Sequence, residues 1–311
     1  MNKQSKILIV GHNDVIENSL TGYLTKNGYS DVLSASEMKL DLFHQGHVER
    51  FFENNRPEYV FLGSSRSGGI EANQQYAAEF MYSNLTIQNH VIHSAYRFGV
   101  KKLLFFSSSC VYPRDCPQPV KEDYLLIGPL EPTSESYAVA KIAGIKMCQA
   151  YKRQHGFNAI VMIPATIYGP GSDFDPRTAH VLGALMGKFY AAAQEGRESV
   201  ELLGTGRPRR EFIYAEDFVE AAMFLMENYD GNAIVNAGTG TDVTIRELAE
   251  RIAKACGFKG RMAFDATKPD GAMQKLLDSE RINTLGWKAR ITLEEGLART
   301  YQWYKKQASE I

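Results

Sequence analysis

The stretch Ile7-Leu8-Ile9-Val10-Gly11 decides which fold this chain is predicted to adopt. Four consecutive apolar residues that end at a glycine are typical of a strand buried on both faces of a sheet. Helical periodicity follows from about Val15 to Asn27, with Ile16, Leu20 and Leu24 on one stripe. A short buried strand that leads directly into a helix is the first half of a βαβ unit, which builds a parallel sheet.

The same alternation continues through the first half of the chain. Short apolar runs predict strands at residues 31–34, 59–62, 103–107 and 159–163. The segments between them predict helices at residues 47–55, 72–98 and 134–155. Strands that alternate with longer helices indicate an α/β fold with a doubly wound, Rossmann-type parallel sheet.

The alternation weakens beyond about residue 170, where glycine and proline become frequent. Helices are predicted at residues 180–195 and 245–256, on either side of a turn at 204–208. We therefore expect a dinucleotide-binding Rossmann domain at 1–170 and a smaller substrate-binding lobe at 171–311. Residues 212–214 and 233–236 read as strands that return to the Rossmann sheet, so the boundary is expected to be interleaved over about 212–240.

Composition limits the classes of partner. The 311 residues carry 35 Lys and Arg against 36 Asp and Glu, a net charge of −1, which argues against a dedicated nucleic-acid or anionic-membrane surface. The four cysteines show no zinc or disulfide spacing, which favours a reduced, cytoplasmic protein without a metal site. No stretch approaches the roughly 20 apolar residues of a membrane span, and the first apolar run is too short for a secretory signal. A small-molecule partner is expected.

Three residues form a candidate centre for carbonyl chemistry. Ser108 follows the strand predicted at 103–107, and Tyr137 and Lys141 stand four residues apart on a predicted helix, so their side chains share one face. A phenol with a pKa of about 10 is a poor acid at neutral pH unless a cation lies beside it, and Lys141 would supply that cation. The Ser108 hydroxyl could donate to the same carbonyl oxygen.

Several motifs now resemble a known family, the GDP-L-fucose synthases of the extended short-chain dehydrogenase/reductases. The resemblance runs from Lys6 to about Tyr304. The matching segments, in chain order, are Ser108-Ser109-Cys110-Val111-Tyr112-Pro113, Glu131-Pro132-Thr133, Tyr137-Ala138-Val139-Ala140-Lys141, Tyr168-Gly169-Pro170, Arg210-Glu211-Phe212, Asn236-Ala237-Gly238-Thr239-Gly240, Lys268-Pro269-Asp270-Gly271 and Lys275-Leu276-Leu277-Asp278.

The resemblance implies a 3,5-epimerase/4-reductase that acts on a GDP-4-keto-6-deoxy sugar, with hexose or heptose left open. Cys110 and His180 match the acid–base pair of the epimerisation, which needs a base and an acid on opposite faces of the sugar ring. A thiol and an imidazole can both be tuned to near-neutral pKa values. Ser108, Tyr137 and Lys141 match the reduction, in which Tyr137 protonates the C4 oxygen and Lys141 also holds the nicotinamide ribose.

The resemblance also implies binding residues and an assembly. Lys188, Arg210 and Lys275 match substrate-binding positions, and an arginine suits a diphosphate because its guanidinium donates in a planar fork. The cofactor implied is NADP(H). The long helices at 72–98 and 134–155 match those that relatives pair in a homodimer.

The cofactor turn departs from the family pattern. Gly11 is kept, but Asp14 and Glu17 replace the second and third glycines. The second glycine lets the backbone approach the pyrophosphate, and the third lets helix and strand pack closely. Asn13 and Glu37 stand where the family has arginines for the 2′-phosphate of NADP. These four substitutions favour NAD(H), or no dinucleotide at all, over NADP(H).

Milder departures concern the strand-end loop and the substrate side. Gly63-Ser64-Ser65 replaces small apolar residues, Leu203 replaces an aromatic residue, and Gln274 replaces a basic one. Three hypotheses follow. The chain is a bifunctional epimerase/reductase that tolerates the altered turn, an epimerase that has lost reduction, or a non-catalytic paralogue. Retention of Ser108, Tyr137 and Lys141 favours the first hypothesis, and the altered turn favours the others.

Overall fold

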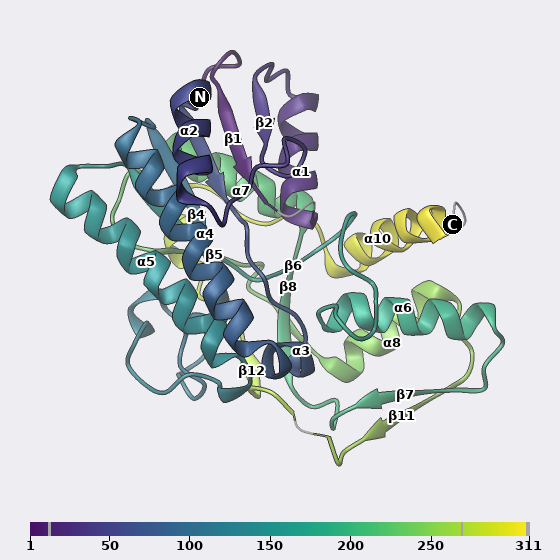
Figure 1. Cartoon of the computed structure of the whole chain (residues 1–311). Helices are drawn as coiled ribbons and strands as arrows, with labels where there is room; N and C mark the ends of the chain where they lie inside the picture. Colours follow the sequence, from purple (N-terminus) through teal and green to yellow (C-terminus); the bar gives the residue numbers. More distant parts are fainter. Residues whose placement is uncertain (12–13, 269, 309–311) are drawn as a thin grey trace.

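The computed structural model describes residues 1–11, 14–268 and 270–308. Its main sheet has six strands, all parallel, in the order β2-β1-β3-β4-β5-β9 (Figure 1). The strands are β1 (Ile7–Val10), β2 (Val32–Ser34), β3 (Tyr59–Leu62), β4 (Lys102–Phe106), β5 (Ala159–Pro164) and β9 (Val235–Ala237). The predicted α/β, Rossmann-type sheet is confirmed, and β1 and β3 have the predicted bounds.

Helices cover both faces of this sheet. The helices α2 (Gln45–Asn55), α4 (Ala77–Arg97) and α5 (Glu135–His155) lie in front of it in Figure 1, and α1 (Val15–Lys26) packs against α7 (Ala215–Asn228), which lies behind. With both faces covered, all four residues of β1 are fully buried. This explains the uninterrupted apolar run with which the strand begins.

The single helix predicted at 72–98 is wrong. The structure has two helices there, α3 (Ile70–Gln75) and α4, separated at Tyr76, whose backbone angles (φ −112°, ψ 32°) lie outside the helical range. Three short 3₁₀ helices follow in the connections: η1 (Ser109–Val111), η2 (Glu122–Tyr124) and η3 (Pro132–Ser134).

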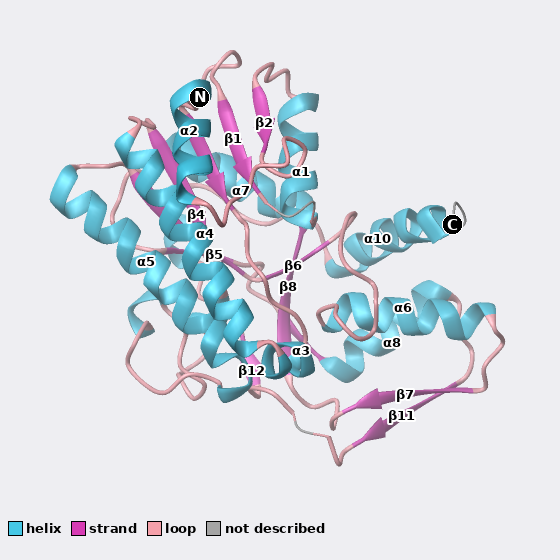
Figure 2. Cartoon of the chain, viewed as in Figure 1, coloured by secondary structure: helices cyan, strands magenta, loops and turns pink. Residues whose placement is uncertain are grey.

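The rest of the chain forms a second lobe with its own hydrophobic core. It contains the helices α6 (Val181–Gln194), α8 (Ile245–Cys256) and α10 (Leu293–Ala308), whereas the short α9 (Glu280–Leu285) packs near β9. The strands β7 (Ser199–Leu203) and β11 (Arg261–Asp265) pair with each other along its lower edge (Figure 2).

A third sheet connects the two lobes. The strands β6 (Thr166–Tyr168), β10 (Asp242–Thr244) and β12 (Gln274–Lys275) all pair with β8 (Arg209–Tyr214). The prediction that residues 212–214 return to the Rossmann sheet is therefore wrong, because β8 pairs with these strands instead. Of the two predicted returning strands, only β9 joins the main sheet. The two-domain division at 170/171 stays a prediction.

β1, β3 and β4 end at one edge of the main sheet, because all its strands are parallel. The second lobe lies beyond that edge (Figure 1). Within the described residues, no helix has both the length and the apolar character needed to cross a bilayer. The same residues contain no cluster of three or more His, Cys, Asp or Glu side chains suited to hold a metal ion.

Candidate active site

The loop after β4 places Ser108 and Cys110 at the sheet edge. Ser108 precedes η1 in an extended conformation, and its hydroxyl accepts a hydrogen bond from the Cys110 backbone N–H at 3.3 Å. The Cys110 thiol sulfur accepts from the ammonium of Lys275 at 3.3 Å. Lys275 lies on β12, 165 residues further along the chain. A cation at this distance favours the thiolate, which is the basic form of cysteine.

The charge around Cys110 outweighs its burial. Burial by itself raises the pKa of the Cys110 thiol, but the Lys275 charge and the hydroxyls of Ser108 and Ser134 oppose it. The net result is a pKa below the ordinary value of a cysteine. Cys110 is therefore suited to accept a proton near neutral pH.

Tyr137 and Lys141 lie one turn apart on α5, as predicted, and both are buried, with 8% and 2% of their surface exposed. The close approach of α5 to β4 requires Gly144, since a β-carbon there would lie 2.4 Å from the Phe105 ring. The Lys141 ammonium donates to the Phe106 carbonyl oxygen at 3.0 Å. Burial lowers the pKa of Lys141 to about 7, although Asp14 opposes the shift.

The Tyr137 phenol faces several hydroxyls. Burial, and next the charge of Cys110, raise the pKa of Tyr137, while the side chains of Ser108, Ser65 and Ser67 act in the opposite direction. A raised pKa keeps the phenol protonated, so Tyr137 is poised to donate a proton rather than to accept one. That Lys141 supports the Tyr137 phenolate stays a prediction.

His180 lies at the N-cap of α6 and is exposed. Its Nε2 atom lies 3.4 Å from the hydroxyl oxygen of Ser67, in the loop after β3. Although the residue keeps solvent-exposed surface, neighbouring protein groups desolvate its imidazole. This desolvation first, and also the Lys275 charge, lower the pKa of His180, whereas Asp173 opposes the shift. The imidazole is therefore joined to the surroundings of Tyr137 through Ser67.

Sequence reasoning missed Ser65, Ser67 and Ser134. The signal for Ser65 was present, because Gly63-Ser64-Ser65 replaces small apolar residues of the family, and Ser67 follows two residues later in the same loop. What pattern alone could not reveal is that this loop reaches the segment before α6. The Gly69 N–H donates to the Thr178 carbonyl oxygen at 3.4 Å, two residues from His180.

The three predicted substrate-binding residues do not all come together. Lys275 and Arg210 are register partners on β12 and β8. The Lys275 charge acts on Cys110, and the Cys110 charge acts in turn on Arg210. Burial lowers the pKa of Arg210, and Cys110, Glu131 and Asp270 oppose this. Lys188 lies on α6, where its ammonium reaches the Glu201 carbonyl oxygen on β7 at 3.5 Å.

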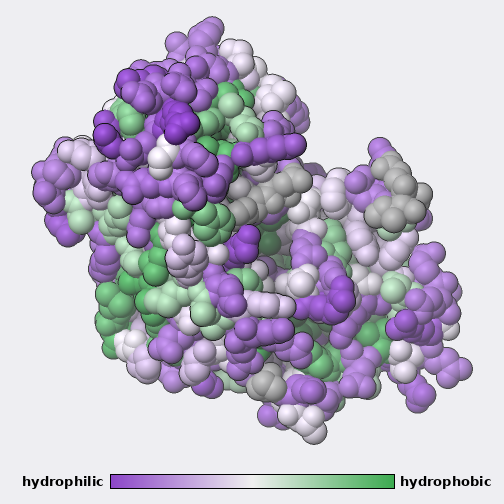
Figure 3. Space-filling view, viewed as in Figure 1, coloured by the Kyte–Doolittle hydropathy of each residue, from purple (hydrophilic) through white to green (hydrophobic). Residues whose placement is uncertain are grey.

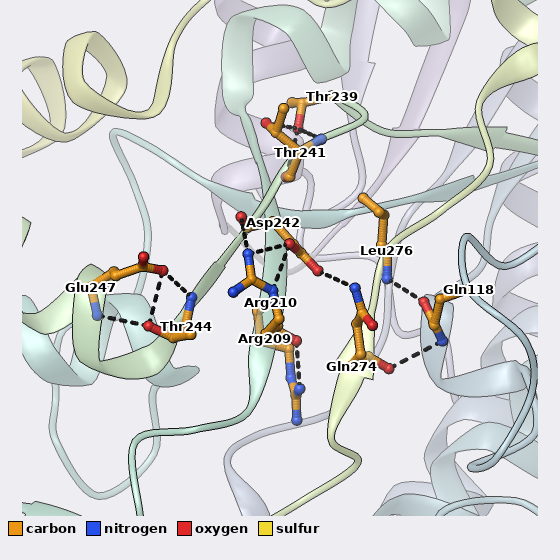
Figure 4. Close-up of polar contacts among 10 residues, drawn as sticks. All are labelled: Gln118, Arg209, Arg210, Thr239, Thr241, Asp242, Thr244, Glu247, Gln274 and Leu276. Atoms are coloured by element: carbon orange, nitrogen blue, oxygen red, sulfur yellow. Dashed lines mark hydrogen bonds and ion pairs between the residues drawn. The ribbon is translucent and has the colours of Figure 1, made fainter.

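The side chains around Arg210 are held by an ordered polar network (Figure 4). The Arg210 guanidinium donates to the Arg209 carbonyl oxygen at 2.7 Å. The Asp242 carboxylate accepts from the Arg209 guanidinium at 2.9 Å and from the Gln274 amide at 2.7 Å. Gln274, which departs from the family's basic residue, therefore helps to hold a carboxylate that Arg209 already neutralises.

The cofactor turn is closed by acids of this chain. The Asp14 carboxylate caps α1 and accepts from the backbone N–H groups of Ile16 and Glu17, both at 3.0 Å. These are the donors that a helix N-terminus ordinarily offers to a phosphate. Gly11 stays essential, because a β-carbon there would lie 2.5 Å from the Glu17 β-carbon.

Glu17 is buried, with 2% exposed, and its carboxylate accepts from the Ser34 hydroxyl at 2.5 Å and from the Ser36 N–H at 3.4 Å. Glu37 is exposed just beyond β2, and its N–H donates to the Ser34 hydroxyl at 3.1 Å. Asn13 lies outside the described residues. The residues around Tyr137 suit the nicotinamide of a dinucleotide. The start of α1 suits its phosphates poorly, because the N–H groups there already donate to the Asp14 carboxylate.

The chain matches known proteins over nearly its whole length. Residues 7–238 match the model of the NAD dependent epimerase/dehydratase family. The chain is 47% identical to GDP-L-fucose synthase 1 of Arabidopsis thaliana, over 98% of this chain and 94% of that protein. It superposes on a GDP-6-OMe-4-keto-L-xylo-heptose reductase from C. jejuni with a TM-score of 0.94 at 37% identity, covering 99% of both chains. It also superposes on a GDP-mannoheptose C4 reductase from Campylobacter jejuni with NADP bound, with a TM-score of 0.89 at 37% identity, covering 98% of this chain and 99% of that one.

Proposed function

The chain belongs to the NAD dependent epimerase/dehydratase family, and from that membership we propose that it is a GDP-4-keto-6-deoxy sugar 3,5-epimerase/4-reductase of the GDP-L-fucose synthase type. The observation that carries the proposal is that the Cys110 thiol, paired with the Lys275 ammonium, lies near the buried Tyr137 phenol. The Lys275 ammonium lies 3.3 Å from the Cys110 sulfur, and the Cys110 charge acts on Tyr137. A proton-abstracting base therefore stands beside a proton donor for a ketone.

The epimerisation uses Cys110 and His180. Protons α to a ketone are acidic because the resulting enolate places its charge on the ketone oxygen. Cys110, held as a thiolate by Lys275, removes such a proton from C3 or C5, and His180 returns one on the opposite face of the ring. Ser108 and Tyr137 stabilise the enolate oxygen by facing it with hydroxyl groups. None of these steps needs an external co-reactant.

The reduction uses the same oxygen. The residues around Tyr137 would face a bound nicotinamide, which would supply the hydride. Tyr137 gives its proton to the C4 oxygen, and its raised pKa ensures that the proton is present when the substrate binds. Lys141, whose pKa of about 7 lets it be neutral or charged, is proposed to contact the nicotinamide ribose. Ser108 orients the ketone.

The substrate diphosphate is proposed to meet Arg210, with Lys275 shared between the substrate and Cys110. Lys188, on α6, is proposed to meet the nucleotide end because it lies apart from that pair. These assignments place the sugar at the edge of a Rossmann domain, residues 1–170, and the nucleotide against the lobe formed by 171–311.

Cofactor choice and assembly are also proposals. NADP(H) is supported by the relatives, and one solved relative has NADP bound. The acids at the turn lead us to propose that free dinucleotide binds weakly. A homodimer through α4 and α5 is supported by exposed apolar side chains on both helices, Tyr82 on α4 at 65% exposure and Val139 on α5. Hydrophobic residues also gather on the lower left of the surface in Figure 3, where α5 lies in Figure 1. A cytoplasmic location is proposed, in keeping with four free cysteines.

The test follows deuterium incorporation into a GDP-4-keto-6-deoxy sugar in D₂O without any cofactor. The wild type is expected to exchange the C3 and C5 protons, and adding a reduced nicotinamide should then yield the 4-hydroxy product. The Cys110→Ser variant should lose exchange and keep binding of GDP, measured by calorimetry. The Cys116→Ser variant, which changes a neighbouring thiol on the same connection, is the control. Exchange of the C3 and C5 protons by Cys110→Ser at the wild-type rate would refute the assignment of Cys110 as the base.

A further inference from the structure

After each reduction, the proposed mechanism leaves Tyr137 as a buried phenolate that must regain a proton. Once it has given its proton to the C4 oxygen, Tyr137 is a phenolate with only 8% of its surface exposed. Burial and the Cys110 charge both disfavour that anion. Lys141, one turn away, is more deeply buried still, with its ammonium on the Phe106 carbonyl oxygen. The phenolate needs a new proton before the next turnover, and neither residue meets bulk water readily.

One hydroxyl lies between the buried tyrosine and an exposed acid–base group. The Ser67 oxygen is 3.4 Å from Nε2 of His180, and the Ser67 side chain also acts on the Tyr137 phenol in the direction that stabilises its phenolate. A hydroxyl that favours a phenolate does so by donating its proton to it. A serine has one such proton but two lone pairs, so it can accept from Nε2 while it donates to the phenol.

The backbone holds this arrangement in place. The loop of residues 63–69 is fixed at its start by the Gly63 and Ser64 N–H groups, which both donate to the Val10 carbonyl oxygen at 2.8 and 2.7 Å. At its end, Gly69 donates to Thr178, close to His180. A β-carbon at Gly68 would lie 2.8 Å from the Ala72 β-carbon, so the chain approaches α3 closely there. Ser67 is therefore presented between two segments rather than left on a free surface.

We propose that Ser67 is a relay residue that carries a proton from the His180 imidazolium to the Tyr137 phenolate after each reduction. The step is balanced. The Nε2–H bond of His180 breaks as its proton passes to the Ser67 oxygen, and the Ser67 O–H bond breaks as its own proton passes to the Tyr137 oxygen. The imidazolium becomes neutral, the phenolate becomes a phenol, and the serine is unchanged. His180 is exposed and recovers its proton from solvent.

The relay links the two chemistries of the proposed function, on which it rests. The group that returns protons to carbon in the epimerisation also resets the group that protonates oxygen in the reduction. The charged groups that face His180 are Asp173, which favours the imidazolium, and Lys275, which disfavours it. Lys275 also faces Cys110, so the same cation affects both the deprotonation of the Cys110 thiol and the reprotonation of the Tyr137 phenolate.

A resting-state experiment tests the hydrogen bond without substrate. The relay requires that Nε2–H of the charged His180 imidazolium donate to the Ser67 oxygen. The ¹⁵N NMR signals of the imidazole, followed through its titration, report on this hydrogen bond, with His180→Asn used to assign them. The Ser67→Ala variant should shift the Nε2 resonance and lower the pKa of His180, because the acceptor is lost. A His180 whose Nε2 resonance and pKa are the same in Ser67→Ala as in the wild type overturns the relay.

Rapid kinetics test the transfer. In the Ser67→Ala variant, the first reduction should proceed near the wild-type rate, because Tyr137 starts protonated, whereas steady-state reduction should fall at least tenfold. Ser67→Thr, which keeps the hydroxyl, should restore the ratio of the two rates. Ser65→Ala, which also faces Tyr137 but has no described contact with His180, should change both rates by the same factor. Ser199→Ala, on exposed β7, should change neither.

The outcomes separate the two proposals. A wild type that turns over, combined with an unchanged ratio of first to steady-state rates in Ser67→Ala, refutes the relay alone. A wild type that exchanges no protons and reduces no GDP-4-keto-6-deoxy sugar refutes the proposed function, and the relay with it. A solvent deuterium isotope effect on the steady-state rate that grows in Ser67→Ala supports the relay, because proton return then limits turnover.

Discussion

Replacing Asp14 by asparagine should strengthen dinucleotide binding. The Asp14 carboxylate holds the Ile16 and Glu17 N–H groups at 3.0 Å each. A phosphate that used the same two donors would lie about 5 Å from the carboxylate. At an effective dielectric constant of about 20, one such like-charge pair costs about 3 kcal/mol, which corresponds to on the order of a hundredfold in affinity.

Asparagine is the right probe because it removes the charge and keeps the cap. Its carboxamide oxygen still accepts from the N–H groups at the start of α1, so the helix loses little stability. The assay is a fluorescence titration of NADPH, and of NADH, against the substrate-free protein. We expect weak or undetectable binding to the wild type and binding about ten- to a hundredfold tighter to Asp14→Asn.

A control makes the same one-charge change elsewhere. Asp265→Asn alters a carboxylate on β11, in the lower edge of the second lobe and away from α1 (Figure 1), and should leave NADPH binding unchanged. Low-micromolar NADPH binding by the wild type would refute the reasoning. An Asp14→Asn variant with wild-type affinity would refute it as well, since the charge would then carry no cost.

Three further predictions concern the thiol, a buried acid and helix packing. Lys275→Met should raise the pKa of Cys110, and alkylation of that thiol by iodoacetamide at pH 7, followed by mass spectrometry, should slow on the order of tenfold. Burial raises the pKa of Glu211 from 4.5 to about 6, so the free energy of unfolding of the wild type should fall by about 2 kcal/mol as the pH rises from 4.5 through 6. Urea unfolding should show this decline in the wild type and not in Glu211→Gln. Gly144→Ala should destabilise the fold by about 1–3 kcal/mol in urea, because its β-carbon would meet the Phe105 ring.

Each of these has its own check. Because the Lys275 charge also acts on Cys116, free N-acetylcysteine in the same sample serves as the reference for Lys275→Met. An unchanged Cys110 rate would show that Lys275 does not tune the thiol. The sign for Glu211 is set by its folded-state pKa, which lies above the unfolded value, so a stability that rises over that range contradicts it. Gly22→Ala, in α1 with open space around it, should stabilise slightly, and equal effects at Gly22 and Gly144 would exclude the packing argument.

Much of the candidate site could be read from the sequence because its parts are local. Tyr137 and Lys141 share a helix face through the helical repeat, and Ser108 and Cys110 follow a buried strand whose apolar run is unmistakable. Strands β1 and β3 and helix α8 matched their predicted bounds because burial on both faces and a capping box at Thr244 mark them strongly. Family motifs supplied His180, which no periodicity indicates.

Other features depended on contacts between distant segments. Pairing of β8 with β6, β10 and β12 moved residues 212–214 out of the main sheet, since an apolar strand pattern does not specify its partner. The break at Tyr76 carries no glycine or proline to announce it. The sequence placed an acid at the cofactor turn, but only the fold showed Asp14 acting as the cap of α1.

By itself, then, the sequence determined the α/β class, the succession along the chain of the strands that carry the chemistry, and the candidates Ser108 and Tyr137, while its resemblance to a known family added Cys110. Tertiary structure alone decided what surrounds them. The Lys275 ammonium reaches Cys110 across 165 residues, and Ser67 meets His180 across 113. The physical reason is that local pattern records which residues are buried and with what period, whereas the pKa values and proton paths of a site depend on charges and hydroxyls that only the packing of separate elements brings within 3–4 Å.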